Sequence, residues 1–430
     1  MKTLLSNGSI FSDIPHNNII KNGYLGIEND RIIYLSSEKP QDHYDQEINC
    51  YNHLLVPGFY NMHTHASMAV LRGTGSGLPL QRWLTEAIFP HEAKMRTEDY
   101  NAGMRISMME MIASGVVSFS DMYFRQDAFM QDVLDSGMRA NINRPMMNLQ
   151  SEDSGETEKI LAEIERLYKE YNGAGNGRII IDFGIHSEYL TNEKSVKKVL
   201  DICQKYHSRM ELHLSETQKE NEECITKRGK TPTQYLFDLG VFDVPIIAAH
   251  CVWLTEHDMD LLKEADATIV HNPSSNLKLG SGFIKMHSIL NKGIRTAIGT
   301  DGSASNNNQN LLEEMHIAAL LSSGINYDAA AITAPQILKM ATINGAEGQG
   351  RNNCGTFALG NKADIISFNL DSPHMHPDLD PAALLIYSAQ SSDIDMNIID
   401  GKMVYKNGEF LTIDKERAIF DLEKSVNFLF

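Results

Sequence analysis

Cysteines are few in this chain, and their spacing suggests no shared site. The five cysteines among the 430 residues are scattered, and no two of them stand in a CxxC pair. Closely spaced cysteines are typical of disulfide frameworks and of thiolate zinc sites, so we expect neither here. The sequence favours five reduced thiols in a cytoplasmic protein.

Long apolar runs and an excess of basic residues are also missing. No stretch of about 18 apolar residues occurs, and residues 1–8 lack the apolar segment of a signal peptide, so we expect no membrane span. Against 38 Lys and Arg stand 56 Asp and Glu, which gives a formal net charge of −18. Because binding to phosphate backbones needs clustered cations, we do not expect nucleic acid as a partner.

What recurs along the chain is a short β-branched run, a polar loop and a longer helical stretch. This alternation indicates βαβ units with a parallel sheet, and its extent fits a (β/α)8 TIM-like barrel. A doubly wound sheet is the alternative, although no glycine-rich phosphate loop follows the first strand. The helical stretches include 156–171 and 193–206, and the expected strands include 116–120, 179–185, 210–214, 246–249, 267–270 and 296–299.

The two ends of the chain have a different pattern. Residues 1–57 contain short alternating runs, and Asn29-Asp30 between two of them predicts a hairpin turn. The tail repeats this pattern around 363–368 and 403–410. We therefore predict a small β-sandwich domain built from residues 1–57 and 362–430, beside a catalytic barrel over 58–361.

The segment 57–65, PGFYNMHTH, contains the strongest local signal. Residues i and i+2 of a strand face the same side, so His63 and His65 can offer two imidazoles to one divalent metal. Two unrelated core or surface histidines would show the same spacing. The position directly after a Pro-Gly turn, where the βα region starts, favours a metal site.

Further residues of metal-ligand type stand at the ends of other expected strands. His213 falls within the run 210–214, Glu216 follows it by three residues, His250 closes a third run, and Asp301 lies between two glycines. Functional residues of barrels gather at strand ends. A buried Asp can also merely cap the next helix. Four such positions in one chain favour a metal site with a general acid or base beside it.

Three imidazoles and one carboxylate suit Zn²⁺, and Fe²⁺ or Mn²⁺ would also bind to such a set. A metal held there would lower the pKa of a bound water to about 7. A bridged two-metal site would require a modified lysine at the end of the middle strand, but residues 178–185 contain no Lys and His186 follows them. The sequence therefore favours one metal per chain.

Together these motifs resemble the amidohydrolase superfamily and, within it, the 5-methylthioadenosine/S-adenosylhomocysteine deaminases. The resemblance covers nearly the whole expected barrel. Its matching segments are 57–65, 78–92, 114–124, 213–216, 250–253, 271–280 and 299–307.

The resemblance implies a zinc-dependent deaminase of adenosine-type nucleosides, with zinc held by His63, His65, His213 and Asp301. It implies that His250 hydrogen-bonds the attacking hydroxide and the adduct. Asp301 would accept the proton of the attacking water, and Glu216 would protonate ring N1 of the adenine.

The same resemblance implies that Glu92, Arg144 and His186 contact the substrate together with Glu216 and Asp301. An ordinary surface ion pair is the alternative for Arg144. A second arginine, expected shortly after Arg144 in enzymes that bind the amino-acid tail of S-adenosylhomocysteine, does not occur in 145–159. Family members often form homo-oligomers, so the resemblance also implies self-assembly.

Two other functions stay open at this point. A deaminase or chlorohydrolase of another aminated heterocycle, such as guanine, a pterin or an s-triazine, would share the attack on a ring carbon. A non-catalytic metal-binding or sensor protein would have lost its acid and base, whereas Glu216, His250 and Asp301 are all present. Zinc deaminases with HxE and PCxxC motifs are excluded by the missing CxxC.

Overall fold

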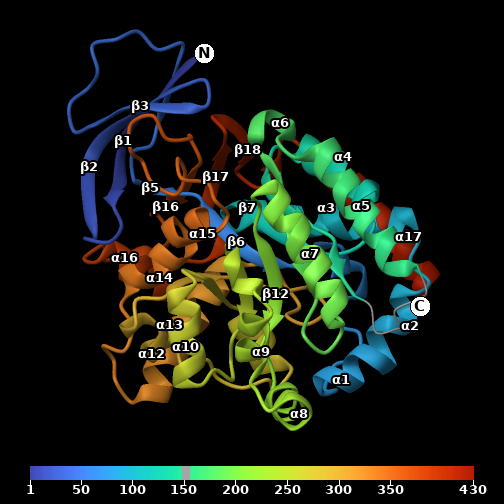
Figure 1. Cartoon of the computed structure of the whole chain (residues 1–430). Helices are drawn as coiled ribbons and strands as arrows, with labels where there is room; N and C mark the ends of the chain where they lie inside the picture. Colours follow the sequence, from blue (N-terminus) through green and yellow to red (C-terminus); the bar gives the residue numbers. More distant parts are fainter. Residues whose placement is uncertain (148–154) are drawn as a thin grey trace.

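The centre of the molecule is a closed parallel β-barrel. Figure 1 shows its strands β6, β7 and β12 in the middle of the molecule, among helices. The structure is a computed structural model that describes residues 1–147 and 155–430. Two parallel sheets, β6–β7–β8–β10 and β9–β11–β12–β13–β14–β15, form its wall. They join because β8 continues into β9 and β10 into β11 after one residue each, and because β15 lies against β6. The expected TIM-like barrel is confirmed, and the doubly wound alternative is not.

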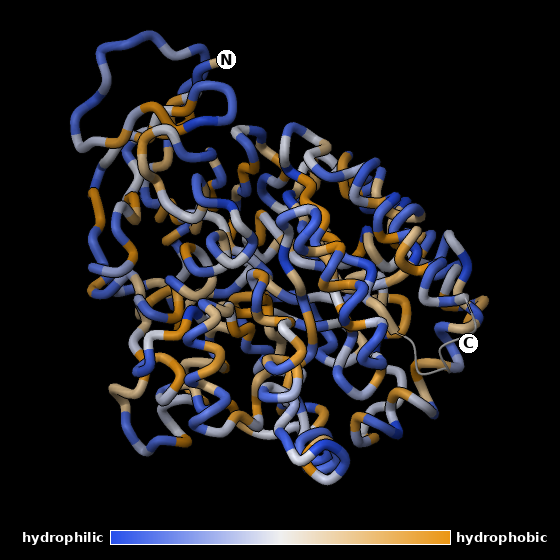
Figure 2. The backbone as a smooth tube through the Cα atoms, viewed as in Figure 1, coloured by the Kyte–Doolittle hydropathy of each residue, from blue (hydrophilic) through white to orange (hydrophobic). Residues whose placement is uncertain are grey.

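The barrel strands are short and buried, as expected for a sheet covered by helices on the outside. They are β6 (Phe59–Thr64), β7 (Val116–Met122), β8 (Arg139–Asn143), β9 (Pro145–Met146), β10 (Ile179–Ile181), β11 (Phe183–Ile185), β12 (Met210–Leu214), β13 (Ile246–His250), β14 (Thr268–His271) and β15 (Arg295–Ile298). In Figure 2 hydrophobic stretches run through the middle of the molecule, whereas α8 at the lower rim is mostly hydrophilic.

Helices surround the barrel. The longer ones are α3 (Thr97–Ala113), α4 (Gln126–Ser136), α5 (Glu156–Tyr171), α7 (Glu193–Tyr206), α8 (Gln218–Arg228), α9 (Pro232–Asp238), α10 (Glu256–Glu264), α13 (Leu311–Asn326) and α14 (Ala334–Ala341). Shorter ones are α1 (Leu80–Arg82), α2 (Phe89–Glu92), α6 (Ala174–Gly177), α11 (Pro273–Lys278), α12 (Met286–Asn291) and α15 (Ile343–Gly348). The six-residue π-helix Trp83–Ile88 joins α1 to α2.

The predicted helices 156–171 and 193–206 have the bounds of α5 and α7. In α5 the buried residues Ile160, Ile164 and Leu167 recur at helical spacing, so one face packs on the barrel and the other carries charges. In α7 the side chain of Asn192 accepts a hydrogen bond from the backbone N–H of Ser195, which caps the first turn.

A second, mostly antiparallel sheet combines both ends of the chain. Its strands are β1 (Lys2–Asp13), β2 (Asn18–Glu28), β3 (Arg31–Ser36), β4 (Gln46–Asn49), β5 (His53–Pro57), β16 (Ile365–Asn369), β17 (Ile394–Ile399), β18 (Lys402–Lys406) and β19 (Glu409–Phe410). The predicted turn at Asn29-Asp30 joins β2 to β3, with Asn29 in the left-handed region. A separate apolar cluster, which includes Leu5 and Ile398, lies inside this β-sandwich-like part.

The tail also contains two helices that pack on the barrel. Helix α16 (Pro381–Tyr387) contacts α13 and α14, and α17 (Lys415–Leu429) lies along α3. Figure 1 shows α17 on the side of the barrel away from the blue N-terminal strands. The domain boundaries 1–57 with 362–430 and 58–361 stay predictions.

The thiol groups and the apolar character of the helices can be compared with the expectations from the sequence. Cys50, Cys203, Cys224, Cys251 and Cys354 are free and buried. In the described ranges 1–147 and 155–430, no helix is both long and apolar enough to cross a membrane.

A buried ion-pair cluster connects the barrel to the end sheet. Arg139 of β8 is 1% exposed and donates to both oxygens of Asp364, at 2.8 and 3.0 Å. It also donates to Asp400 at 2.7 Å, and Lys362 lies 3.0 Å from the same carboxylate. Asp364 directly precedes β16 and Asp400 directly follows β17, whereas Arg139 is the first residue of β8. The cluster therefore holds the amino-terminal end of this barrel strand against the end sheet.

We predict that Arg139→Ala lowers the free energy of unfolding by about 3–5 kcal/mol, since it leaves the buried carboxylate of Asp364 without its ion-pair partner. Urea unfolding followed by circular dichroism measures the effect. Arg82→Ala, which removes an exposed i,i+4 pair with Glu86, is the control and should leave the unfolding midpoint unchanged. Equal midpoints for both variants would contradict this role of Arg139.

Candidate active site

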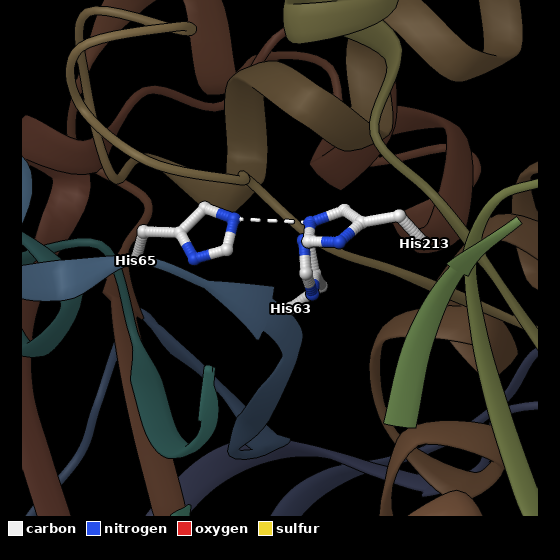
Figure 3. A group of neighbouring side chains, drawn as sticks. All are labelled: His63, His65 and His213. Carbon is white, nitrogen blue, oxygen red and sulfur yellow. Dashed lines mark hydrogen bonds between the residues drawn. The ribbon is translucent and has the colours of Figure 1, made fainter. Parts of the chain in front are cut away.

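Three imidazoles converge at the carboxyl-terminal end of the barrel strands. His63 lies in β6, His65 is the first residue after β6, and His213 lies in β12. The Nε2 atoms of His65 and His213 are 3.2 Å apart, and one ring nitrogen from each of the three residues lies within 4.8 Å of the others. Figure 3 shows the three rings turned toward one another from two strands.

Asp301 completes this cluster from the loop after β15. Its Oδ1 lies 3.2 Å from His65 Nε2 and 3.6 Å from His63 Nε2. Its Oδ2 accepts hydrogen bonds from the hydroxyls of Ser275 (2.6 Å) and Ser305 (2.8 Å). Burial alone would raise the pKa of Asp301, but the neighbouring imidazoles and Ser275 hold it well below its usual value. Asp301 is therefore an ionised carboxylate with one oxygen directed at the histidines.

These residues fit a divalent metal ion. His63 Nε2 is buried without a hydrogen-bond partner among the described residues. Leaving such a group unpaired costs roughly 1–3 kcal/mol. Burial and the neighbouring His65 lower the pKa of His63 well below its usual value, so its ring is neutral and has a lone pair to offer. Neutral imidazoles beside one carboxylate form a donor set that binds zinc and similar metals.

The carboxylate that orients His63 was not predicted from the sequence. In the tautomer that leaves Nε2 free, the Nδ1–H of His63 donates to Glu211 Oε1 at 2.7 Å. Glu211 is 1% exposed, and its other oxygen accepts a hydrogen bond from Asn143. A signal was present in the sequence, because Glu211 precedes His213 by two residues and so faces the same side of β12.

Glu216 and His250 lie beside the cluster. Glu216 Oε1 accepts a hydrogen bond from the Ser281 hydroxyl (3.1 Å), and its Oε2 lies 4.0 Å from His250 Nε2. Burial raises the pKa of Glu216, more than His250 lowers it. The Nδ1 of His250 lies 2.8 Å from the Asn276 side-chain oxygen, so its Nε2 is directed toward Glu216. Neither Ser281 nor Asn276 was predicted from the sequence.

The backbone at these strand ends is strained. Ser215, His250 and Asp301 have φ values of 49°, 72° and 61°, in the left-handed region that non-glycine residues avoid. Each such residue costs on the order of 1–3 kcal/mol. The loop after β12 is held in place by Glu220, which accepts the backbone N–H groups of Ser215 (2.9 Å) and Glu216 (2.7 Å). The backbone at Ser215, His250 and Asp301 therefore fixes the directions in which the side chains of these three residues leave the chain.

A cavity opens over this cluster and encloses about 800 Å³ of space, part of it solvent. Seven of the residues predicted for the site line it. They are His65, His213, Glu216, His250, Asp301, Glu92 and His186. Its apolar lining includes five residues of the segment that contains α1 and α2. The lining residues are His65, Met68, Leu80, Trp83, Leu84, Ile88, Phe89, Glu92, Met122, Tyr123, Phe124, Pro145, Met147, His186, Tyr189, His213, Glu216, His250, Leu279, Asp301 and Ser305.

His186 and Glu92 therefore lie where a substrate in the cavity can contact them. His186 follows β11, and burial, together with the neighbouring His65, lowers its pKa to about 3, so its ring is neutral. Glu92 accepts a hydrogen bond from the Tyr123 hydroxyl, and burial raises its pKa. Tyr123 was not singled out in the sequence.

Arg144 does not line the cavity. It interrupts the strand between β8 and β9, and its Nε donates to Glu163 at 3.3 Å. Its guanidinium carbon lies 5.0 Å from the centre of the Phe124 ring, and Phe124 is itself a lining residue. The predicted role of Arg144 in substrate binding stays a prediction. Part of the stretch without a second arginine, residues 148–154, lies outside the described residues.

Comparison with known proteins agrees with this geometry. The model of the Amidohydrolase family matches residues 54–404, and that of the BsNagA composite domain matches residues 11–52. The chain is 39% identical over 425 residues to 5-methylthioadenosine/S-adenosylhomocysteine deaminase of Caldanaerobacter subterraneus subsp. tengcongensis, covering 99% of this chain and 98% of that one.

Two further proteins are similar along nearly their whole length. 5'-Deoxyadenosine deaminase of Methanothermobacter thermautotrophicus is 38% identical over 409 residues, or 94% of each chain. The crystal structure of an adenosine deaminase from Xanthomonas campestris with bound zinc has a TM-score of 0.94 and 26% identity, covering 99% of this chain and 98% of that one.

We predict that Glu211→Gln weakens metal binding about 10- to 100-fold, because the carboxylate that orients His63 is lost. Competition with a coloured zinc chelator measures the affinity. Glu188→Gln is the matched control, since Glu188 is also buried but pairs with Arg228 at 2.8 Å. An unchanged affinity in Glu211→Gln would show that Glu211 does not orient a ligand.

Proposed function

The chain belongs to the amidohydrolase family, and from this membership and the geometry of its site we propose that it is a zinc-dependent hydrolytic deaminase of adenosine-type nucleosides. The reaction adds water to C6 of the adenine ring and releases ammonia, leaving the inosine analogue. The observation that carries the proposal is a buried carboxyl, Glu216, beside a cluster of metal-ligand residues in one cavity. The names of the similar deaminases support the nucleoside substrate.

We assign His63, His65, His213 and Asp301 to the zinc. Their donor atoms are the imidazole nitrogens and carboxylate oxygen that zinc prefers. A zinc ion bound there would supply hydroxide at neutral pH by lowering the pKa of water to about 7. Residues 178–185, which include β10 and β11, contain no Lys that could bridge a second metal, and this supports one metal per chain.

Glu216 is the proposed general acid. Burial raises its pKa, which favours the protonated carboxyl, and such a carboxyl can donate its proton to N1 of the adenine ring. Protonation of N1 draws electrons from C6 and makes that carbon open to attack. The hydrogen bond from Ser281 fixes the carboxyl while it acts.

Asp301 and His250 handle the water and the leaving group. As an ionised carboxylate, Asp301 accepts a proton from the attacking water, and that proton can pass to the departing amine. The C6–N bond then breaks and ammonia leaves, while the second proton of the added water replaces the one that Glu216 gave to N1 and the C6 carbonyl forms. The Nε2 of His250, held in position through Asn276, hydrogen-bonds the oxygen that adds to C6.

Glu92 and His186 are the proposed substrate contacts beyond the reacting ring. Glu92 already accepts the Tyr123 hydroxyl, and its carboxyl can accept further hydrogen bonds from ribose hydroxyls. The neutral ring of His186 can hydrogen-bond a nucleoside without adding charge to the cavity.

Release of ammonia tests the proposal. The zinc-loaded protein is given 5'-methylthioadenosine, adenosine and guanine in separate assays, with bound zinc measured on the same samples. We expect ammonia from the adenosines and none from guanine. Ammonia from guanine alone, at full zinc content, would contradict the substrate class and favour another heterocycle.

We predict that Glu216→Gln keeps its zinc but lowers kcat by about 10²- to 10⁴-fold, because the amide cannot donate the proton to N1. Steady-state kinetics and metal analysis of one preparation measure both quantities. Glu222→Gln, at an exposed position of α8, is the control and should keep full activity. Full turnover in Glu216→Gln would remove Glu216 from the mechanism.

A further inference from the structure

A short segment after β14 contacts all three proposed catalytic groups. The segment is 272–281, and it contains α11. Its contacts are hydrogen bonds of Ser275 with Asp301 (2.6 Å), of Asn276 with His250 (2.8 Å) and of Ser281 with Glu216 (3.1 Å). The backbone N–H of Ser281 donates to the Asn276 carbonyl at 2.8 Å, which connects the end of the segment to α11. A shift of α11 would therefore displace all three contacts together.

The start of α11 is held by a carboxyl group from another helix. The first N–H groups of a helix have no partner within the helix, and a side chain just before it often accepts one of them. Asn272, which precedes α11, makes no such capping hydrogen bond. The N–H of Ser274 donates instead to Oε2 of Glu314, a fully buried residue of α13. The distance is 3.0 Å, and this bond fixes the start of α11 against α13.

The second oxygen of Glu314 holds the loop after β15. Its Oε1 accepts a hydrogen bond from the Asn306 amide at 2.7 Å, and the same amide donates to the Thr300 carbonyl at 2.7 Å. Thr300 directly precedes Asp301 in the sequence. Ser305, the residue before Asn306, donates its hydroxyl to Asp301 at 2.8 Å. One carboxyl group thus joins the two loops whose serines hold Asp301.

Resting on the proposed function, we propose that Glu314 is a positioning residue that keeps α11 and the loop after β15 in the relative position that aims the acid, the base and His250. Glu314 is not among the described residues that line the cavity. Its side-chain hydrogen bonds go to the two loops, at Ser274 and Asn306, and not to the catalytic groups themselves. It therefore acts on the reaction through the residues beside these two contacts.

The direction of the Asp301 carboxylate depends on both loops. Its Oδ2 accepts one hydroxyl from each loop, and this leaves Oδ1 to face the imidazoles of His63 and His65. If the loops separate, one hydroxyl is lost and the carboxylate can rotate. Removing a group that holds a metal ligand in place typically costs roughly 10- to 100-fold in metal affinity or activity. Because Glu314 lies one contact further from the site, we expect an effect near the lower limit of that range.

The test is Glu314→Gln, which keeps the size of the side chain but replaces one acceptor by an N–H donor. If Asn306 turns its amide over to accept the new N–H, its bond to Thr300 is lost. With 5'-methylthioadenosine we expect kcat per bound zinc to fall about tenfold. KM should stay within about threefold, because Glu92 and His186 lie outside the two loops. Zinc affinity, measured by competition with a coloured chelator and without turnover, should also fall about tenfold.

Two other carboxyl groups serve as controls. Glu313→Gln changes the exposed neighbour on the same helix and should leave kcat and zinc affinity unchanged. Asp258→Asn changes a carboxyl that is also fully buried and that accepts the Thr255 N–H at the start of α10, at 2.8 Å and outside the cavity lining. This variant should lower the thermal unfolding midpoint, as Glu314→Gln does, without lowering kcat. Equal losses of kcat in both buried variants would overturn the inference, because lower stability would then explain them.

Asn306→Ala removes one of the two contacts and is the milder variant should Glu314→Gln fail to fold. Its kcat per bound zinc should fall by about threefold or more. Unchanged kcat and unchanged zinc affinity in Glu314→Gln and Asn306→Ala, beside an active wild type, would overturn the inference and leave the deaminase assignment intact. No ammonia from the zinc-loaded wild type would instead defeat the proposed function. The zinc affinities would still decide about Glu314 in that case, because an unchanged affinity would overturn its role.

Discussion

The carboxylate of Asp301 is the charge around which the active end of the barrel is arranged. One of its oxygens is held by two serine hydroxyls, and the other faces the imidazoles of His63 and His65. The carboxylate comes from the loop after β15, the strand that closes the barrel against β6. The backbone N–H of Asp301 donates to the His63 carbonyl at 2.9 Å, so barrel closure and ligand position depend on the same contact.

The surroundings give two buried carboxyl groups opposite properties. Asp301 lies among imidazoles and stays ionised, whereas Glu216 is dominated by burial and tends to keep its proton. Separating an acid from a base by environment is how one site performs both steps of a hydrolysis at neutral pH. Ser281 and Glu220 then fix the loop that carries the acid, at the expense of a strained backbone at Ser215.

Much of this fold could be predicted from the sequence because its barrel strands are short β-branched runs, with long amphipathic helices among the elements between them. Histidines and acids at the strand ends could be placed for the same reason, since parallel strands bring their ends to one side. Glu211 was visible in principle through its spacing from His213. Ser275, Ser281 and Ser305 were not, because a serine in a loop has no periodicity that shows which group it contacts.

The packing of the tail and of Arg144 also could not be obtained from local patterns. Helix α17 follows β strands in the sequence but lies on α3, since its apolar face fits there. Arg144 lies between β8 and β9, yet it pairs with Glu163 from α5 and lies against the Phe124 ring. Both outcomes depend on contacts between segments that are distant in the sequence.

One titration tests whether turnover depends on a single bound zinc. Zinc is added stepwise to metal-free protein while ammonia release from 5'-methylthioadenosine and bound zinc are measured together. The account predicts that activity rises in proportion to bound zinc and stops rising at about one zinc per chain. Full activity without zinc, or activity that appears only as a second zinc binds, would contradict it.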